Sequence, residues 1–327
     1  MIVFISVRNF FIFGLFSQSV IFFVIYFIMP TINPIKSSQI LAVFIILLMY
    51  TCACSNNDKE DESAVKIIFL HHSTGEVIWN GKPLSLVKKA LSKISDNIKD
   101  AFPPKAKMLS QFSEYNKKTG KNYFITEQDF PKAKPYGWNN NPYDYYNIWV
   151  YNQGDDYYME EPTLELLTQK YDVIIFKHCY PVCNIQPDKD TADINSYYKS
   201  LSNYKLQYLA LREKMHDYPE TKFIVFTGAS QVKSNASLEE AQRAREFFNW
   251  VTAEWDLPDD NLFIWDLYNI ETEGGLFLKE EYATSPNDPH PNKLLASKAN
   301  KLLFDRIIDV IETNGQLTNL KGEIAQP

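Results

Sequence analysis

Four short apolar runs, separated by longer amphipathic stretches, are the feature that most limits what this chain can fold into. They read VKIIFLH at 65–71, DVIIFKH at 172–178, KFIVFTG at 222–228 and NLFIWDL at 261–267. Strands that are apolar almost without alternation are buried on both faces, as in a parallel sheet covered by helices. The runs therefore predict a mostly parallel β-sheet inside an α/β domain.

The stretches between these runs carry helical patterns. We expect helices at 84–100, 162–170, 191–216, 238–255 and from about 292 to 312. Ser237 is the expected N-cap of one of them, with Glu240 at the position that completes a capping box. Strand and helix in alternation predict a three-layer α/β/α sandwich with a doubly wound sheet.

An aromatic-rich segment at about 104–160 breaks this alternation, and we interpret it as an insertion that forms an elaborated loop. Its rings lie among Asn, Pro, Gly and Asp; they are Trp138, Tyr143, Tyr145, Tyr146, Trp149, Tyr151, Tyr157 and Tyr158. Tyr and Trp bury large areas, so the rings can form a second small core. Aromatic rings beside amides also suit the stacking of sugar rings, which is the glycan-facing alternative.

The first 54 residues read as an export leader. Residues 10–28 are apolar for long enough to span a bilayer, and 40–50 form a second, shorter apolar run. Read from Met29, the segment has the layout of a signal peptide, so Met29 is a candidate for the natural start of translation in place of Met1. An uncleaved transmembrane anchor with the same outward topology is the alternative.

The end of the leader predicts a lipid anchor. Thr51-Cys52-Ala53-Cys54 resembles the lipobox of bacterial lipoproteins, and the resemblance implies lipidation of Cys54. Residues 55–63 are too charged to pack and predict a flexible tether, whose Lys59-Glu60-Asp61 resembles the export tag of Bacteroidetes surface lipoproteins. We expect one domain over 64–327, lipid-anchored to a bacterial membrane, at the cell surface or facing the periplasm.

The charge and the cysteines limit the partners and the chemistry. A net charge of −7 and a pI near 5.4 argue against a nucleic-acid partner, which needs a dense basic face. Cys179 and Cys183 are the cysteines of the domain; an exported protein can join them in a disulfide, and buried free thiols are the alternative. The sequence does not decide the oligomeric state.

Histidines gather where the predicted strands end. Of the five histidines, His71, His72 and His178 follow apolar runs and His290 precedes the last helix, so only His216 lies elsewhere. Ligands of open α/β sheets bind outside the carboxyl ends of the strands. This pattern predicts that the functional site lies at that edge of the sheet.

Ser73 is the expected nucleophile at this edge. It directly follows the first strand and precedes Gly75, which lets the chain turn and leaves backbone N–H groups free for an oxyanion. His290 can act as its base if the loop before the last helix folds over the first strand end. Asp288, two residues earlier, can then hold the imidazole in the correct tautomer.

An early serine with a late Asp and His resembles the SGNH (GDSL-like) hydrolases. The resemblance implies their flavodoxin-like fold, Ser73 as nucleophile, His290 as general base, Asp288 as its partner and the Ser73 N–H as an oxyanion donor. Here His71-His72-Ser73 stands where the family has Gly-Asp-Ser, and Asp288-Pro289-His290 is one residue tighter than its Asp-x-x-His. Candidates for the remaining oxyanion or substrate contacts are Asn184, His178 and Gly137.

Three functions remain open. The first is a serine esterase without a cofactor that hydrolyses acyl esters, with acetyl groups on a polysaccharide as one substrate. The second is a metallohydrolase that takes its ligands from the histidines and Asp288. Against it, adjacent residues on a strand point to opposite faces, so His71 and His72 rarely share a metal. The third is a non-catalytic glycan-binding lipoprotein that binds through the aromatic segment.

Overall fold

The described residues form a sheet of five parallel strands with the order β2-β1-β3-β4-β5. Its strands are β1 (Val65–His71), β2 (Tyr123–Asp129), β3 (Val173–Phe176), β4 (Lys222–Phe226) and β5 (Leu262–Trp265). The chain passes from β1 to β2 on one side and returns to β3 on the other side of β1. The direction of winding therefore reverses between β1 and β3, which is where doubly wound sheets bind ligands.

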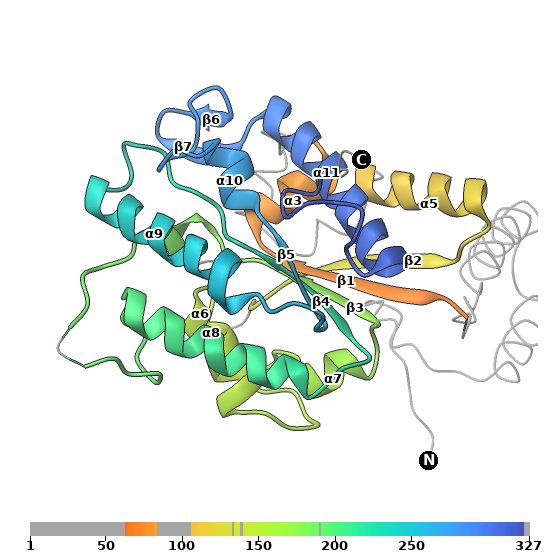
Figure 1. Ribbon diagram of the computed structural model, residues 1–327, viewed down its shortest axis with the longest axis horizontal. Helices are drawn as coiled ribbons and strands as arrows, with labels where there is room; N and C mark the ends of the chain where they lie inside the picture. The colour runs from red at the N-terminus through yellow and green to blue at the C-terminus, as the bar shows by residue number, and fades with distance from the viewer. Residues whose placement is uncertain (1–62, 84–105, 133, 138–139, 190, 324–327) are drawn as a thin grey trace, which may run out of the picture. The chain divides into compact units, whose positions relative to one another are not determined.

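Helices cover both faces of this sheet (Figure 1). One layer holds α3 (Ser73–Asn80), α5 (Lys107–Thr119), α10 (Leu267–Thr272) and α11 (Lys293–Thr313). The other holds α6 (Pro142–Tyr146), α7 (Leu164–Thr168), α8 (Leu201–His216) and α9 (Leu238–Trp250). Short helical turns η3 (Asn147–Tyr151), η4 (Tyr180–Cys183) and η5 (Val251–Trp255) and a hairpin of β6 (Ala283–Ser285) and β7 (Asp288–Pro291) complete the elements. The chain is thus a three-layer α/β/α domain.

The computed structural model describes residues 63–83, 106–132, 134–137, 140–189 and 191–323. These residues belong to one unit, Ser63–Pro327. The expected leader, the lipidation site Cys54, nearly all of the tether and the expected helix at 84–100 lie outside them. Within the described ranges, no helix combines the length and the apolar character that a membrane span requires.

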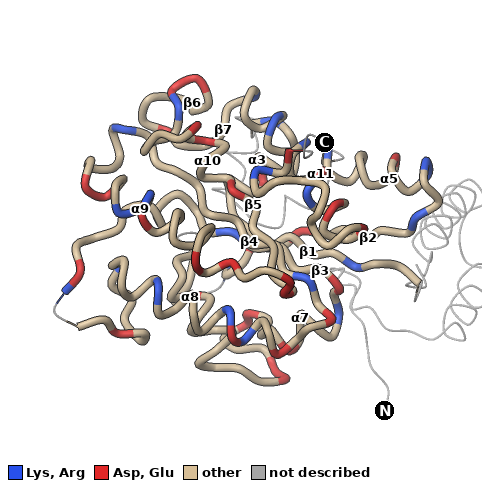
Figure 2. Tube along the Cα trace, viewed as in Figure 1, with Lys and Arg blue, Asp and Glu red and all other residues tan. Residues whose placement is uncertain are grey.

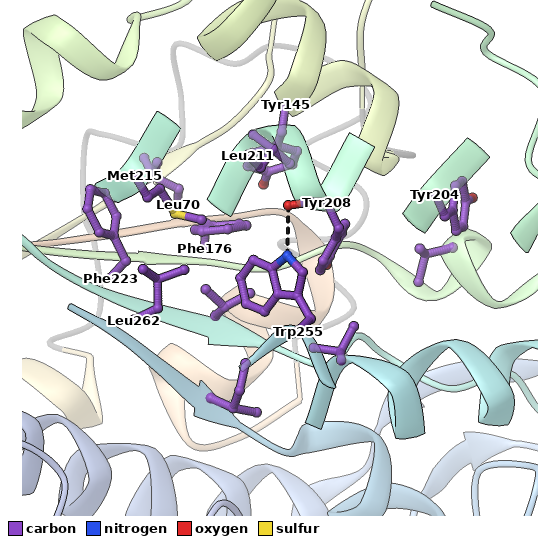
Figure 3. Close-up of a cluster of buried hydrophobic side chains, with 14 of the residues drawn as sticks. Leu70, Tyr145, Phe176, Tyr204, Tyr208, Leu211, Met215, Phe223, Trp255 and Leu262 are labelled. Carbon is purple, nitrogen blue, oxygen red and sulfur yellow. Dashed lines mark hydrogen bonds between the residues drawn. The ribbon is translucent and has the colours of Figure 1, made fainter. Parts of the chain in front are cut away.

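Two hydrophobic cores, one on each face of the sheet, hold the layers together. Ile68 and Leu70 of β1 point into the core under α8 and α9, whereas Ile67 and Phe69 point into the core under α3 and α11. Figure 3 shows the first of these cores, where the indole of Trp255 donates a hydrogen bond to the carbonyl of Tyr208 at 2.7 Å. Burial on both faces explains why the strands are apolar without alternation.

The predicted strands and most of the predicted helices are confirmed, with shifted ends. α9 has the predicted cap: the Ser237 hydroxyl accepts from the Glu240 N–H at 3.1 Å, and the Glu240 carboxylate accepts from the Ser237 N–H at 2.8 Å. α8 begins only at Leu201, because Ser200 caps it there.

The interpretation of 104–160 as an elaborated loop is wrong for its first part. α5 and β2 lie within it, and β2 pairs with β1 over its full length. As an edge strand, β2 alternates buried Tyr123 and Ile125 with exposed Phe124, and therefore lacks the continuous apolarity that marks the inner strands. The second part forms α6, η3 and irregular chain.

Acidic and basic side chains are mixed over the surface. Figure 2 shows Asp and Glu interspersed with Lys and Arg along helices of both layers. The absence of a nucleic-acid partner stays a prediction from the net charge.

Candidate active site

Ser73 lies at the point where the winding of the sheet reverses. β1 ends at His71, His72 is the N-cap of α3, and Ser73 is the first residue of that helix. The first N–H groups of an α-helix have no acceptor within the helix and favour negative charge. The half-buried Ser73 hydroxyl therefore sits beside backbone donors that can face an anionic oxygen.

A chain of hydrogen bonds joins this serine to a histidine 217 positions away and to an aspartate beside it. The Nε2 atom of His290 lies 2.9 Å from the Oγ of Ser73, and its Nδ1 atom lies 2.5 Å from a carboxylate oxygen of Asp288. A carboxylate only accepts hydrogen bonds, so Nδ1 carries the proton and Nε2 presents its lone pair to the hydroxyl. This is the geometry of a nucleophile, a general base and an orienting acid.

The β6–β7 hairpin explains how the tight Asp288-Pro289-His290 spacing works. Asp288 and His290 are two apart on the strand β7, and residues two apart in a strand point to the same face. Pro289 points to the other face and is buried. The main-chain N–H of His290 also donates to Asp288 at 3.0 Å, which ties the carboxylate to the strand.

Tyr180 is a site residue that sequence reasoning missed. Its ring meets the His290 imidazole edge to face, with centroids 5.4 Å apart and an angle of 82° between the planes. It begins η4, which follows β3, so the rule that selects strand ends could have found it. Burial raises the pKa of its phenol. Tyr180 thus packs against the imidazole of His290.

His71 and His72 brace the strand end without joining this chain of hydrogen bonds. His71 is buried, and its Nε2 lies 2.8 Å from Glu127 of β2. The Nε2 of His72 lies 2.6 Å from the carbonyl of Pro131. Burial lowers the pKa of His72 to about 4, so its ring is neutral near pH 7 and donates to that carbonyl.

Gly75 allows α3 to approach β1 closely. A Cβ atom at this position would lie 2.3 Å from the Cβ of His71. The glycine is needed for this close contact rather than for an unusual backbone angle. It thereby determines how closely Ser73 approaches the end of β1.

The expectation that His178 contacts an oxyanion or substrate is wrong. Its ring is fully buried among Tyr145, Phe176 and Tyr208, on the sheet face opposite to α3. Its Nδ1 lies 2.7 Å from the carbonyl of Asn140. Burial lowers its pKa to about 3. His178 is a core residue.

Asn140 fixes the strand end beside which His178 lies. Its side-chain amide donates to the carbonyl of Lys177 at 2.7 Å and accepts from the N–H of Cys179 at 2.5 Å. It is buried and has a positive φ of 35°. These contacts attach the segment before α6 to the carboxyl end of β3.

The other candidate contacts differ in what the structure shows. The amide of Asn184 donates to the carbonyl of Asn235 at 3.0 Å and accepts from Gln231 at 2.9 Å, so it links two loops. Gly137 is half-buried, and its carbonyl accepts from the N–H of Asn140 at 3.1 Å. The geometry assigns neither one to Ser73.

Cys179 and Cys183 are buried free thiols, which answers the disulfide question left open by their spacing. Within the ranges that the structure describes, no three His, Cys, Asp or Glu side chains gather as metal ligands do. His71, His72, His178 and His290 each turn to a different partner.

Two buried titratable side chains follow the strands β3 and β5 in the chain. Lys177 and Glu271 are both fully buried, and Glu271 accepts hydrogen bonds from the N–H and hydroxyl of Ser230. Burial raises the pKa of Glu271 to about 7, against the hydrogen bonds from Ser230 and the charge of Lys177. The apolar patterns of the sequence did not indicate that Lys177 or Glu271 would be buried.

No protein-family model matches this chain, and no curated protein matches it.

Substitution of Gly75 by Ala is predicted to disturb the site. The added methyl group must push α3 away from His71, which costs about 1–3 kcal/mol of unfolding free energy. We expect a lower midpoint of thermal unfolding and slower reaction of Ser73 with a fluorophosphonate probe. An unchanged midpoint and labelling rate would contradict the close contact.

Replacement of His178 by Asn is predicted to change the pH dependence of stability. The pKa of His178 is about 3 in the folded chain against 6.5 as its ordinary value, so the unfolded state binds the proton first as the pH falls. His178 makes its full contribution to the stability of the folded state above pH 6.5, and this contribution declines as the pH falls below 6.5. The stability difference between wild type and His178→Asn should therefore shrink by about 1.4 kcal/mol between pH 7.5 and 5.5 in urea unfolding.

The measurement must compare wild type with His178→Asn, because other titratable groups change the stability with pH in the opposite direction. Burial raises the pKa of Asp144 and of Asp256 to about 7, so their contributions decline as the pH rises. These groups are shared by both variants and cancel in the difference. A stability difference that stays constant over this range would show that His178 is not held neutral.

Proposed function

We propose that this protein is an exported serine esterase of the SGNH type that hydrolyses acyl esters, with acetyl groups on a polysaccharide as its substrate class. The observation that carries the proposal is the unbroken chain of hydrogen bonds from Asp288 through His290 to Ser73. The sheet order and the sequence order of serine, aspartate and histidine support the family assignment.

The chemistry follows from the protonation states. His290 takes the proton from the Ser73 hydroxyl as its oxygen attacks the ester carbonyl, and Asp288 stabilises the resulting imidazolium. His290 then gives the proton to the departing alcohol. A water molecule, activated by the same imidazole, releases the acid from the acyl-serine and restores the hydroxyl.

The start of α3 supports stabilisation of the intermediate. Ser73 is the first residue of α3, so its N–H and the positive end of the helix dipole would stabilise the negative charge that develops on the attacked carbonyl oxygen. We propose this N–H as one oxyanion donor, and Gly137 stays a candidate for a second.

Exposed tyrosines support a carbohydrate substrate. Three of the named rings of the aromatic segment, Tyr145, Tyr146 and Trp149, are buried, and Tyr145 and Trp149 belong to the core under α8 and α9. Tyr151 and Tyr157 are 64% and 66% exposed, and Tyr197 is 50% exposed and accepts a hydrogen bond from the Asn141 amide at 2.9 Å. Exposed rings beside amides suit the stacking of sugars. The same observation favours glycan binding without catalysis as the second candidate function.

Hydrolysis of p-nitrophenyl acetate tests the esterase directly. Ser73→Ala is predicted to lower kcat by about 10⁶-fold, because it removes the nucleophile. Asp288→Asn is predicted to lower kcat by about 10⁴-fold, because it removes the group that fixes the imidazole tautomer. Ser110→Ala is a matched control, since its hydroxyl donates to the carbonyl of Ala106 at the start of α5. Turnover that survives Ser73→Ala unchanged would exclude this mechanism.

Labelling with a fluorophosphonate separates the two candidate functions. An esterase carries the label on the peptide that contains Ser73. A protein that retains glycan affinity but shows no labelling at Ser73 is the binding protein instead.

We also propose anchoring through a lipid on Cys54. Cys54→Ser is predicted to abolish incorporation of labelled palmitate and to release the domain from the membrane fraction, whereas Cys52→Ser should leave both unchanged. A membrane-bound Cys54→Ser protein would favour an uncleaved transmembrane anchor.

A further inference from the structure

The turn that leads into Asp288 is exposed. The β6–β7 hairpin lies outside the main sheet, and residues 284–287 are exposed. Its ladder consists of two residue pairs, Ala283 with Pro291 and Ser285 with Asp288. Exposed turns open locally at lower cost than buried elements. Hydrogen bonds between this turn and the rest of the domain therefore help to fix the position of the carboxylate relative to Ser73.

Two side chains of the loop after β4 make such contacts. The hydroxyl of Ser234 donates to the carbonyl of Pro286 at 2.7 Å, and the amide of Asn235 donates to the carbonyl of Asn287 at 3.3 Å. The Ser234 Oγ also lies 3.0 Å from the side-chain oxygen of Asn235, and the carbonyl of Pro286, at 2.7 Å, is the nearer acceptor for its one hydroxyl hydrogen. Both carbonyls belong to the two residues directly before Asp288.

This loop is itself attached to the rest of the domain. The carbonyl of Asn235 accepts from Asn184 at 3.0 Å, and Asn184 accepts from Gln231 at 2.9 Å. The carbonyl of Gln231 accepts from the N–H of Leu278 at 2.9 Å. A continuous set of hydrogen bonds thus runs from the end of η4, four residues after Tyr180, to the turn before Asp288.

We propose that Ser234 and Asn235 are positioning residues of the esterase, which hold the turn at 286–287 so that Asp288 aligns His290 with Ser73. The proposal rests on the proposed function. Neither residue touches the reacting atoms; each acts through the main chain that leads into Asp288. A small displacement of a catalytic group, about 1 Å, can cost about 10²-fold in rate, so two hydrogen bonds at this place have a large effect on turnover.

The test compares Ser234→Ala, Asn235→Ala and the double variant with wild type in p-nitrophenyl acetate hydrolysis. We expect kcat of the double variant to fall about 10- to 100-fold while KM stays within about threefold, because substrate contacts are retained. Ser234→Thr keeps the hydroxyl and should restore most of kcat. Ser237→Ala is the matched control: it lies in the same loop but caps α9, so it should lower stability and leave kcat unchanged.

A second measurement does not depend on activity. The proton between His290 and Asp288 should give a downfield proton resonance in wild type, and in the double variant this resonance should broaden or disappear while the fold is retained. If wild type shows no turnover that depends on Ser73, the esterase proposal fails and the resonance still decides the positioning. A double variant with wild-type kcat, or with an unchanged resonance, overturns the proposal.

Discussion

The hydrogen bond between His290 and Ser73 joins two parts of the chain that no local rule brings together. Its 2.9 Å length requires that α3 lie close on the end of β1 and that the β6–β7 hairpin fold back over the same edge. Gly75 allows the first arrangement, and packing of β7 on α3 and α11 together with hydrogen bonds from the loop after β4 supports the second. The site is therefore a product of two independent packing arrangements that meet at one point.

The parallel sheet supplies the rigid part of this arrangement. Because both faces of the sheet are buried, β1 and β3 cannot shift without disturbing two cores. Residues at the carboxyl ends of these strands are therefore held in fixed positions. His71, His72 and Asn140 extend this rigid part beyond the strands by hydrogen bonds to β2, Pro131 and the end of β3. Rigid elements hold a catalytic geometry better than free loops do.

The Asp288-Pro289-His290 spacing shows how secondary structure decides the role of a short motif. In a helix or a loop, residues two apart do not generally face the same way, but in β7 they do. The carboxylate can then reach Nδ1 of the imidazole at 2.5 Å although the motif is one residue shorter than the family pattern. The extended conformation of β7 brings the two side chains together without an additional residue between them.

Much of this protein could be derived from its sequence. The continuous apolar runs predicted the inner strands, because burial on both faces leaves no room for alternation. The end of the first run predicted Ser73, and the segment before the last helix, together with the resemblance to SGNH hydrolases, predicted Asp288 and His290. Only the tertiary structure added β2, since an edge strand lacks that pattern, and only it removed His178 from the site, since a histidine at a strand end can point to either face. The roles of Tyr180, Ser234 and Asn235 were also visible only in the tertiary structure. Contacts between loops depend on how distant segments pack, and they produce no periodic pattern in the sequence.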